Sequence, residues 1–199
     1  MTKINVILGS SRKASLGRGL FKNLEQQKAF FEQENDVELQ FIDLAEVNLP
    51  FFYEDLPPMQ NKNRALQANE QKWVDDMNSA DGYLFLVPEY NHSVPAVLKN
   101  ALDFLAFEGK DKPAKVITYS NNGRGGQFAF LGLLPTLSQL GFFTLPKPTV
   151  IGNVDKNFQL DGDYQPDAPS KEYYTKKLAA TVNEISFYSK LFKEHPFNK

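Results

Sequence analysis

The stretch GYLFLVPEYNHSVPAVLKNALDFL, residues 82–105, decides the fold class of this chain. It opens with a continuous apolar run at residues 82–87, which is typical of a strand buried on both faces of a parallel sheet. The run stops at Pro88, and a helical apolar pattern covers residues 95–107, with Pro95 well placed for a first helical turn. A buried strand, a short polar turn and a helix make up the repeating unit of an α/β fold.

The same alternation continues on both sides of this unit. Predicted strands cover residues 3–9, 37–44, 82–87 and 114–120, and a fifth strand is supplied by residues 142–145 and 149–151 across a Pro-Lys-Pro break. Predicted helices cover residues 18–33, 67–79, 95–107 and 128–140, and a last helix follows Ser170 as its N-cap. The sequence therefore predicts a three-layer α/β sandwich with a five-stranded parallel sheet and right-handed crossovers.

Four segments carry further expectations. Residues 50–63 hold three prolines and are predicted to form a long loop, and loops of this length are often functional. Residues 153–169 look irregular. The helix at residues 128–140 is apolar over most of its circumference, so we expect burial on two sides. The last helix keeps one apolar face, made of Tyr174, Leu178, Val182, Ile185 and Phe192.

Composition limits the classes of function. A length of 199 residues fits one domain, with 42% hydrophobic and 23% charged residues, as in a globular protein with a real core. The net charge of −2 provides no strong positive field, so neither nucleic acid nor an anionic membrane is an expected partner. The chain has no cysteine and two histidines, and we expect no metal site. No run approaches the roughly 18 apolar residues of a membrane span, and the first residues read as a strand, which predicts a cytoplasmic protein.

Unusual polar sequences follow three of the predicted strands. They are GSSRKASLG at residues 9–17, PEYNHS at residues 88–93 and SNNGRGG at residues 120–126. In a wound parallel sheet, ligands bind beyond the carboxyl ends of the strands, where these three segments should meet. We call them the first, second and third turns.

The first turn has the composition of a phosphate-binding loop. It combines hydroxyl groups, cationic side chains and free amide groups at the start of a helix. The candidate cofactor-binding residues here are Ser10, Arg12, Ser15, Leu16 and Gly17. The alternative is an N-capping loop with surface charges. Neither the P-loop ending Gly-Lys-Ser/Thr nor the dinucleotide fingerprint G-x-G-x-x-G is present.

The second turn offers Pro88, Glu89, Tyr90 and Asn91 directly after a buried strand. Its main-chain amides and carbonyls are suited to the imide edge of a flavin, and Tyr90 supplies an aromatic surface. A purely structural turn is the alternative interpretation. His92 is a candidate general acid, although a lone loop histidine is more often only solvated.

The third turn offers Ser120, Asn122 and Gly123 as candidate cofactor-binding residues. Its glycines allow the main chain to approach a planar ligand and to direct amide groups at developing negative charge, as on a reduced flavin. A glycine-rich turn that leads into a tightly packed helix is the alternative.

Taken together, the three turns resemble those of the NADPH-dependent FMN reductase family of flavodoxin-like proteins, over residues 4–140. The most specific part is Pro88-Glu89-Tyr90-Asn91 followed by Pro95, Leu98-Lys99-Asn100-Ala101 and Asp103. The family's phosphate loop is matched by Gly9, Ser10, Arg12 and Ser15, and its Ser-x-x-Gly-x-x-Gly turn by Ser120, Gly123 and Gly126. Ala96 and Phe104 stand where the family often has glycine and tryptophan.

The resemblance implies a flavodoxin-like fold and an FMN cofactor, with NADPH or NADH as co-substrate. Hydride would pass through flavin N5 to a small acceptor such as a flavin, a quinone, an azo compound or a metal oxyanion. No catalytic side chain is expected, because the flavin carries the chemistry. The resemblance also implies a homodimer or homotetramer with the active site near a subunit boundary.

Three functions stay open at this point, and so do two details of the site. An electron-carrying flavodoxin without its own substrate is the main rival, although such carriers are typically strongly acidic and this chain is nearly neutral. An inactive regulatory relative is the third candidate. A 2′-phosphate on the co-substrate could meet Arg12, Lys13, Arg18 or Arg124, and the loop at residues 50–63 could shape the acceptor pocket.

Overall fold

The computed structural model describes residues 1–61 and 63–197 and contains one parallel sheet. The strand order is β2-β1-β3-β4-β5, and β6 also pairs with β4, so that β5 and β6 together occupy the fifth position. Every strand pair is parallel. The strands are β1 (Thr2–Leu8), β2 (Val37–Asp43), β3 (Gly82–Pro88), β4 (Pro113–Tyr119), β5 (Phe143–Thr144) and β6 (Thr149–Ile151). The predicted five-stranded parallel sheet is confirmed.

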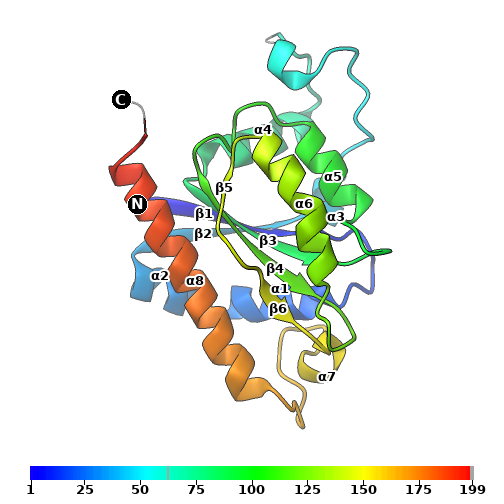
Figure 1. The fold of residues 1–199 in the computed structure, drawn as a ribbon, viewed down its shortest axis with the longest axis vertical. Coiled ribbons are helices and arrows are strands. Elements are labelled where there is room, and N and C mark those ends of the chain that lie inside the picture. Colours follow the sequence, from blue (N-terminus) through cyan, green and yellow to red (C-terminus); the bar gives the residue numbers. More distant parts are fainter. Residues whose placement is uncertain (62, 198–199) are drawn as a thin grey trace.

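Helices cover both faces of this sheet, as the ribbon in Figure 1 shows. One core lies between the sheet and α4, α5 and α6, and includes Trp73, Phe85 and Leu133. The other lies between the sheet and α1, α2 and α8, and includes Leu20 and Ile185. The helices are α1 (Gly17–Gln26), α2 (Lys28–Asn35), α3 (Leu44–Val47), α4 (Ala68–Ser79), α5 (Ala96–Asp103), α6 (Gln127–Gln139), α7 (Val154–Asn157) and α8 (Lys171–Glu194), with a short 3-10 helix at Pro58–Gln60. The arrangement is the predicted three-layer sandwich.

The helix predicted at residues 18–33 is divided into α1 and α2. Gln27 joins the two at φ −93° and ψ 7°, which departs from helical geometry. Its side-chain amide donates to the Asn23 backbone oxygen at 3.1 Å and side-chain oxygen at 3.0 Å. The spacing from Leu24 to Phe31 suits an unbroken helix equally well, so periodicity alone did not reveal the break.

The helix predicted at residues 95–107 is shorter than expected. Helix α5 ends at Asp103, and Pro95 is its N-cap residue. The Leu105 amide donates to the Leu102 carbonyl at 3.1 Å, which tightens the last turn, and the Ala106 amide donates to the Glu108 carboxylate at 2.6 Å. These bonds take the chain out of the helix before Phe107.

The last strand is interrupted where the sequence has Pro-Lys-Pro. Two prolines remove backbone donors, and Lys147 between them takes the left-handed φ of 64°. The ammonium group of Lys115, on β4, bridges the gap by donating to the Lys147 carbonyl at 3.0 Å and pairing with the Glu184 carboxylate at 2.6 Å. The Lys115 ammonium group thus contacts the chain between β5 and β6, where the backbone pairing with β4 is interrupted.

The proline-rich loop is fastened to α5 and to the segment after it. Asn100 accepts from the Phe52 amide and donates to the Pro50 carbonyl, each at 2.8 Å. Arg64 pairs with Glu54 at 2.6 Å and donates to the Phe104 carbonyl at 2.7 Å. The loop is therefore ordered, as far as it is described; residue 62 lies outside the described residues.

The two helices with special burial expectations differ in outcome. Tyr174, Leu178, Val182 and Ile185 of α8 are buried as predicted, whereas Phe192 is only half-buried against Phe143. Ser170 occupies the N-cap position, but its side chain makes no capping hydrogen bond.

Helix α6 is buried on one side only within this chain, and Leu131 on the other side is 59% exposed.

The segment predicted to be irregular, residues 153–169, contains the short helix α7. Across the described residues, no helix has the length and apolar character to cross a membrane.

Candidate functional site

The three polar turns meet at one edge of the sheet, as their positions after β1, β3 and β4 predict. A pocket of about 220 Å³ is lined by residues from all three. Its lining consists of Arg12, Ala14, Ser15, Leu16, Pro88, Glu89, Tyr90, Tyr119, Ser120 and Asn121. We call this the rim pocket. It contains seven of the twelve predicted cofactor-binding residues; the other five, Ser10, Gly17, Asn91, Asn122 and Gly123, belong to the same turns without lining it.

The first turn is joined to the other two by hydroxyl groups. Ser10 and Ser15 are buried, and their Oγ atoms lie 3.1 Å from the Tyr90 hydroxyl and 3.4 Å from the Tyr119 hydroxyl, respectively. A side chain at Gly17 would come within 2.0 Å of the Tyr119 hydroxyl, so only glycine allows α1 to begin this close to β4. The turn is thereby held against the end of the sheet.

The first turn also keeps unused backbone donors. In the described part of the chain, the amides of Arg12, Lys13, Ala14 and Leu16 donate no hydrogen bond, while the Ser15 amide donates to the Arg12 carbonyl at 3.1 Å. Free amides before the first turn of a helix are the donors that bind phosphate groups. This turn therefore has the donors that a phosphate requires.

Tyr119 is a member of the rim pocket that the sequence did not indicate. It ends strand β4 and is 2% exposed, so in sequence it looks like an ordinary core aromatic. Burial raises the pKa of its hydroxyl above the ordinary value, and the hydrogen bond with Ser15 partly opposes this shift. The hydroxyl therefore stays protonated and neutral at physiological pH. Its position directly before Ser120 was the only available signal.

The cations of the first turn differ in availability. Arg12 is exposed and lines the pocket, and Lys13 is exposed beside it. Arg18 is committed elsewhere, because it pairs with the buried Asp43 at 2.8 Å. Of the four cations considered for a 2′-phosphate, Arg18 is thus the least available, and Arg124 lies exposed on the third turn.

The second turn is tightly folded. Tyr90 and Ser93 exchange two backbone hydrogen bonds of 3.0 Å, and Asn91 and His92 between them take left-handed φ angles of 50° and 62°. The Glu89 carboxylate accepts from the Phe128 amide at 2.8 Å. The ring of His92 stacks on that of Phe128, with ring centroids 4.8 Å apart and planes 5° apart.

The third turn is organised by its own side chains and by β6. Ser120 Oγ donates to the Asn122 side-chain oxygen at 3.0 Å, and that oxygen also accepts from the Arg124 amide at 2.9 Å. Gly126 has φ 71° and approaches the Tyr119 carbonyl closely, so a side chain there would be strained. Gly123 differs, because an added Cβ would meet no atom within 4 Å. Asn122 thus supports the turn, and Gly123 faces open space.

Sequence comparison agrees with this geometry. The family described as NADPH-dependent FMN reductase matches residues 2–156, which include all three turns and every strand of the sheet. The chain belongs to the NADPH-dependent FMN reductase family.

Relatives in this family cover nearly the whole chain. An NAD(P)H-dependent FMN reductase of Schizosaccharomyces pombe is 28% identical over 207 residues, covering 99% of this chain and 94% of the relative. An NADPH azoreductase of a Bacillus species is 28% identical and covers 96% of this chain and 95% of the relative. An NADPH:quinone oxidoreductase of Arabidopsis thaliana is 31% identical, covering 72% of this chain and 68% of the relative.

A solved structure shares the fold. FerB, an NAD(P)H:(acceptor) oxidoreductase of Paracoccus denitrificans, superposes with a TM-score of 0.73 at 24% identity and covers 96% of this chain and 98% of its own. At that identity the likeness concerns the flavodoxin-like fold alone.

Asn100, one of the landmark residues of the family, has a structural role here. Asn100 holds the proline-rich loop through the two hydrogen bonds given above. Phe104, where the family often has tryptophan, is fully buried, and its ring meets that of Phe52 edge to face at 5.3 Å. Ala96, where glycine is common, is exposed at the first turn of α5. Neither departure disturbs the rim pocket.

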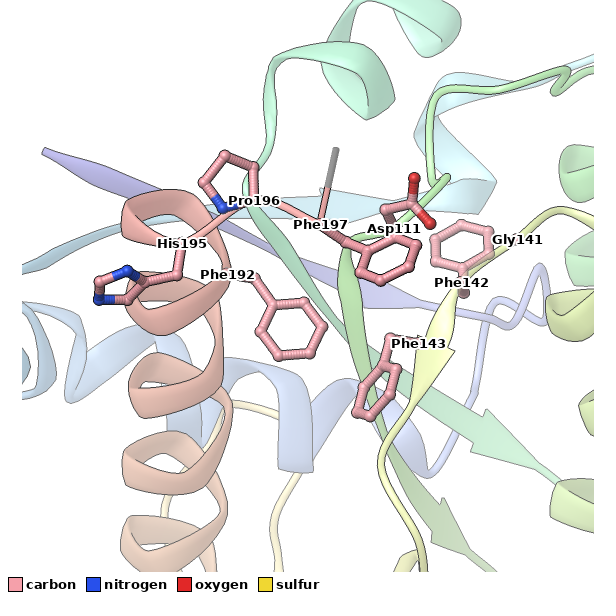
Figure 2. Close-up of a pocket in the computed structure, with 8 residues that line it drawn as sticks. All are labelled: Asp111, Gly141, Phe142, Phe143, Phe192, His195, Pro196 and Phe197. Atoms are coloured by element: carbon pink, nitrogen blue, oxygen red, sulfur yellow. The ribbon is translucent and has the colours of Figure 1, made fainter. Parts of the chain in front are cut away.

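A larger pocket lies away from this site. It measures about 500 Å³ and is lined by Phe142, Phe143, Phe192 and Phe197 together with Asp111 and His195. Figure 2 shows these rings gathered between β5 and the end of α8, and β5 pairs with the amino end of β4, opposite the three turns. It holds no part of the family signature, so the smaller rim pocket is the candidate active site.

Proposed function

We propose that the rim pocket binds FMN and that this FMN takes electrons from NADPH or NADH and reduces a small acceptor. Flavins, quinones, azo compounds and metal oxyanions are the acceptor classes in view. The observation that carries the proposal is that one pocket is lined by residues of all three turns. The family match and the relatives named as FMN, azo and quinone reductases support the same activity.

The residues of the pocket fit FMN chemically. The first turn provides free amides and Arg12 for a phosphate group, which carries two negative charges. The second turn provides main-chain groups and the aromatic ring of Tyr90. The open space beside Gly123 leaves room for a flat ring near the third turn. We therefore assign cofactor binding to the twelve predicted residues and add Tyr119.

The protein's part in the reaction is to bind and orient. Bound FMN supplies the hydride chemistry, because its ring system both accepts and donates reducing equivalents. We assign no catalytic side chain. The hydroxyls of Tyr90 and Tyr119 are engaged by Ser10 and Ser15, and they fix the wall of the pocket rather than transfer protons.

We further propose that residues 1–199 form a single FMN-binding domain that assembles into a homodimer or homotetramer. Support for assembly comes from α6, whose outer side exposes Leu131 at 59%, and from Phe51, 82% exposed on the proline-rich loop. Apolar side chains left uncovered on neighbouring elements are typical of a surface that another subunit covers.

The proline-rich loop is proposed to shape the acceptor pocket. A second pocket of about 270 Å³ lies between this loop and the first turn, with Phe51, Ala96 and Ser11 among its lining residues. The loop thus reaches the same edge of the sheet as the rim pocket.

An electron carrier without a substrate is disfavoured, because the net charge of −2 is far from the strong acidity with which such carriers dock.

The proposal is tested by titrating purified protein with FMN in a calorimeter and then measuring steady-state NADPH oxidation with a quinone and an azo dye. We expect stoichiometric FMN binding and turnover with at least one acceptor. Bound FMN that NADPH does not reduce would favour the carrier, and well-folded protein that takes up no FMN would favour an inactive relative.

A further inference from the structure

Helix α6 begins without a capping side chain of its own. Its N-cap residue is Gly126, which has no side chain to offer. The Phe128 amide, in the first turn of the helix, donates instead to Glu89 Oε2 at 2.8 Å, across 39 residues of sequence. A carboxylate at a helix N-terminus satisfies an orphan amide and interacts favourably with the helix dipole. Glu89 of the second turn thus caps the helix that starts at the third turn.

A second contact joins the same two turns. The His92 ring stacks on the Phe128 ring at 4.8 Å, so Phe128 is held by its backbone and by its side chain. A Cβ added at Gly126 would lie 3.2 Å from the Glu89 Cβ, which shows how closely the turns approach. Asn91 and His92 have left-handed backbone conformations, which persist only where surrounding contacts hold them. We call this set of contacts the Glu89–Phe128 brace.

The Glu89 carboxylate forms no ion pair within the described part of the chain. Among residues 1–61 and 63–197, no lysine or arginine nitrogen lies within 4.0 Å of its carboxylate, although Glu89 is half-buried and lines the rim pocket. Among the contacts described above, the amino end of α6 is the one favourable electrostatic partner of the Glu89 carboxylate. A carboxylate in this position opposes the gain of further negative charge nearby.

We propose that Glu89 is a positioning residue with two effects. Its carboxylate holds the second and third turns at a fixed separation, and its charge lowers the affinity of the pocket for reduced FMN relative to oxidised FMN. The inference rests on the proposed function, because it concerns FMN in the rim pocket. The proposed function assigns the main chain of Glu89 to cofactor binding, and beyond it we assign the Glu89 side chain to α6 and to the redox balance.

Two substitutions separate the effects. In Glu89→Gln the side-chain oxygen still accepts from the Phe128 amide but the charge is lost, whereas Glu89→Ala loses both. In the FMN-free protein, we expect hydrogen exchange of the Phe128 amide, followed by NMR, to accelerate about tenfold in E89A and to change little in E89Q. Glu34→Gln is the matched control, because Glu34 is an exposed carboxylate on α2, remote in sequence from the three turns.

Binding and potential are measured next with FMN. We expect E89A to weaken FMN binding about tenfold and E89Q to stay close to wild type. In both variants, the affinity for reduced FMN relative to that for oxidised FMN should be about tenfold higher than in wild type. This change raises the midpoint potential of a two-electron couple by about 30 mV. E34Q should change neither quantity.

Each contrary result overturns a specific part. If E89A leaves both the exchange rate of the Phe128 amide and the FMN affinity unchanged, Glu89 does not hold the two turns together. If E89Q leaves the midpoint potential unchanged, the Glu89 charge does not affect the redox balance. An affinity loss in E89Q equal to that of E89A would mean that the carboxylate contacts FMN directly. If E89A does not fold, Glu89→Asp replaces it, since the shorter side chain withdraws from Phe128 and keeps the charge. Wild-type protein that binds no FMN would contradict the proposed function. The exchange experiment on the FMN-free protein would still test whether Glu89 holds the two turns together.

Discussion

At the scale of single residues, Arg12 is the cation best placed to bind a phosphate group in the rim pocket. It lines the pocket and is exposed, whereas Arg18 is paired with Asp43. Hydrogen bonds to a charged group contribute about 1.5–3 kcal/mol, so Arg12→Ala should weaken FMN binding roughly 10- to 150-fold. Fluorescence titration of FMN measures this. Lys22→Ala, which removes an exposed cation from α1, should leave the affinity unchanged; equal losses in both variants would show that only general charge matters.

Two glycines of the site make a matched pair for a stability test. Gly17→Ala places a methyl group within 2.0 Å of the Tyr119 hydroxyl, and we expect a loss of about 1–3 kcal/mol in the free energy of unfolding. Gly123→Ala meets no atom within 4 Å, so its change should stay within about 0.5 kcal/mol. Urea denaturation of the FMN-free proteins compares them. Equal stability of the two variants would contradict the packing of α1 against β4.

The residues of the site differ in how well sequence reveals them. The three turns were predictable because polar and glycine-rich segments after buried strands must gather at one edge of a parallel sheet. Tyr119 was not, since a tyrosine at the end of an apolar strand has the pattern of a core residue. The partner of Glu89 was also out of reach, because the helix that it caps lies far away along the chain.

At the scale of elements, the proline-rich loop depends on Asn100. Asn100→Ala removes the two 2.8 Å hydrogen bonds to Phe52 and Pro50, which together contribute on the order of 1–3 kcal/mol locally. We expect amide exchange at residues 50–61 to accelerate about tenfold, and the ratio of kcat/KM for a quinone to that for an azo dye to change. Asn35→Ala on α2 is the control. Faster exchange with an unchanged ratio would separate this loop from acceptor choice.

Element boundaries were less predictable than element types. Every predicted strand formed, and the Pro-Lys-Pro sequence correctly marked the interruption of the fifth. The break at Gln27 and the early end of α5 depend on hydrogen bonds made by Asn23 and Glu108, which no apolar periodicity records. The order of the proline-rich loop likewise depends on long-range contacts by Asn100 and Arg64.

At the scale of the whole molecule, the exposed side of α6 predicts self-association. Leu131→Glu places a charge on that side and should reduce the mass measured by light scattering in solution at micromolar concentration. Phe30→Glu is the control, because Phe30 is 56% exposed on α2, on the other face of the sheet. Wild-type protein that is strictly monomeric at this concentration would refute assembly through α6.

The central claim for the molecule is that three turns at one edge of the sheet hold FMN that a reduced nicotinamide can reduce. The visible absorption spectrum of the FMN-loaded protein, recorded before and after anaerobic addition of NADPH, tests it most directly. We predict an oxidised flavin spectrum that bleaches on addition of NADPH and returns when a quinone is admitted. A bound flavin spectrum that NADPH leaves unchanged, or protein that retains no flavin, would contradict the claim.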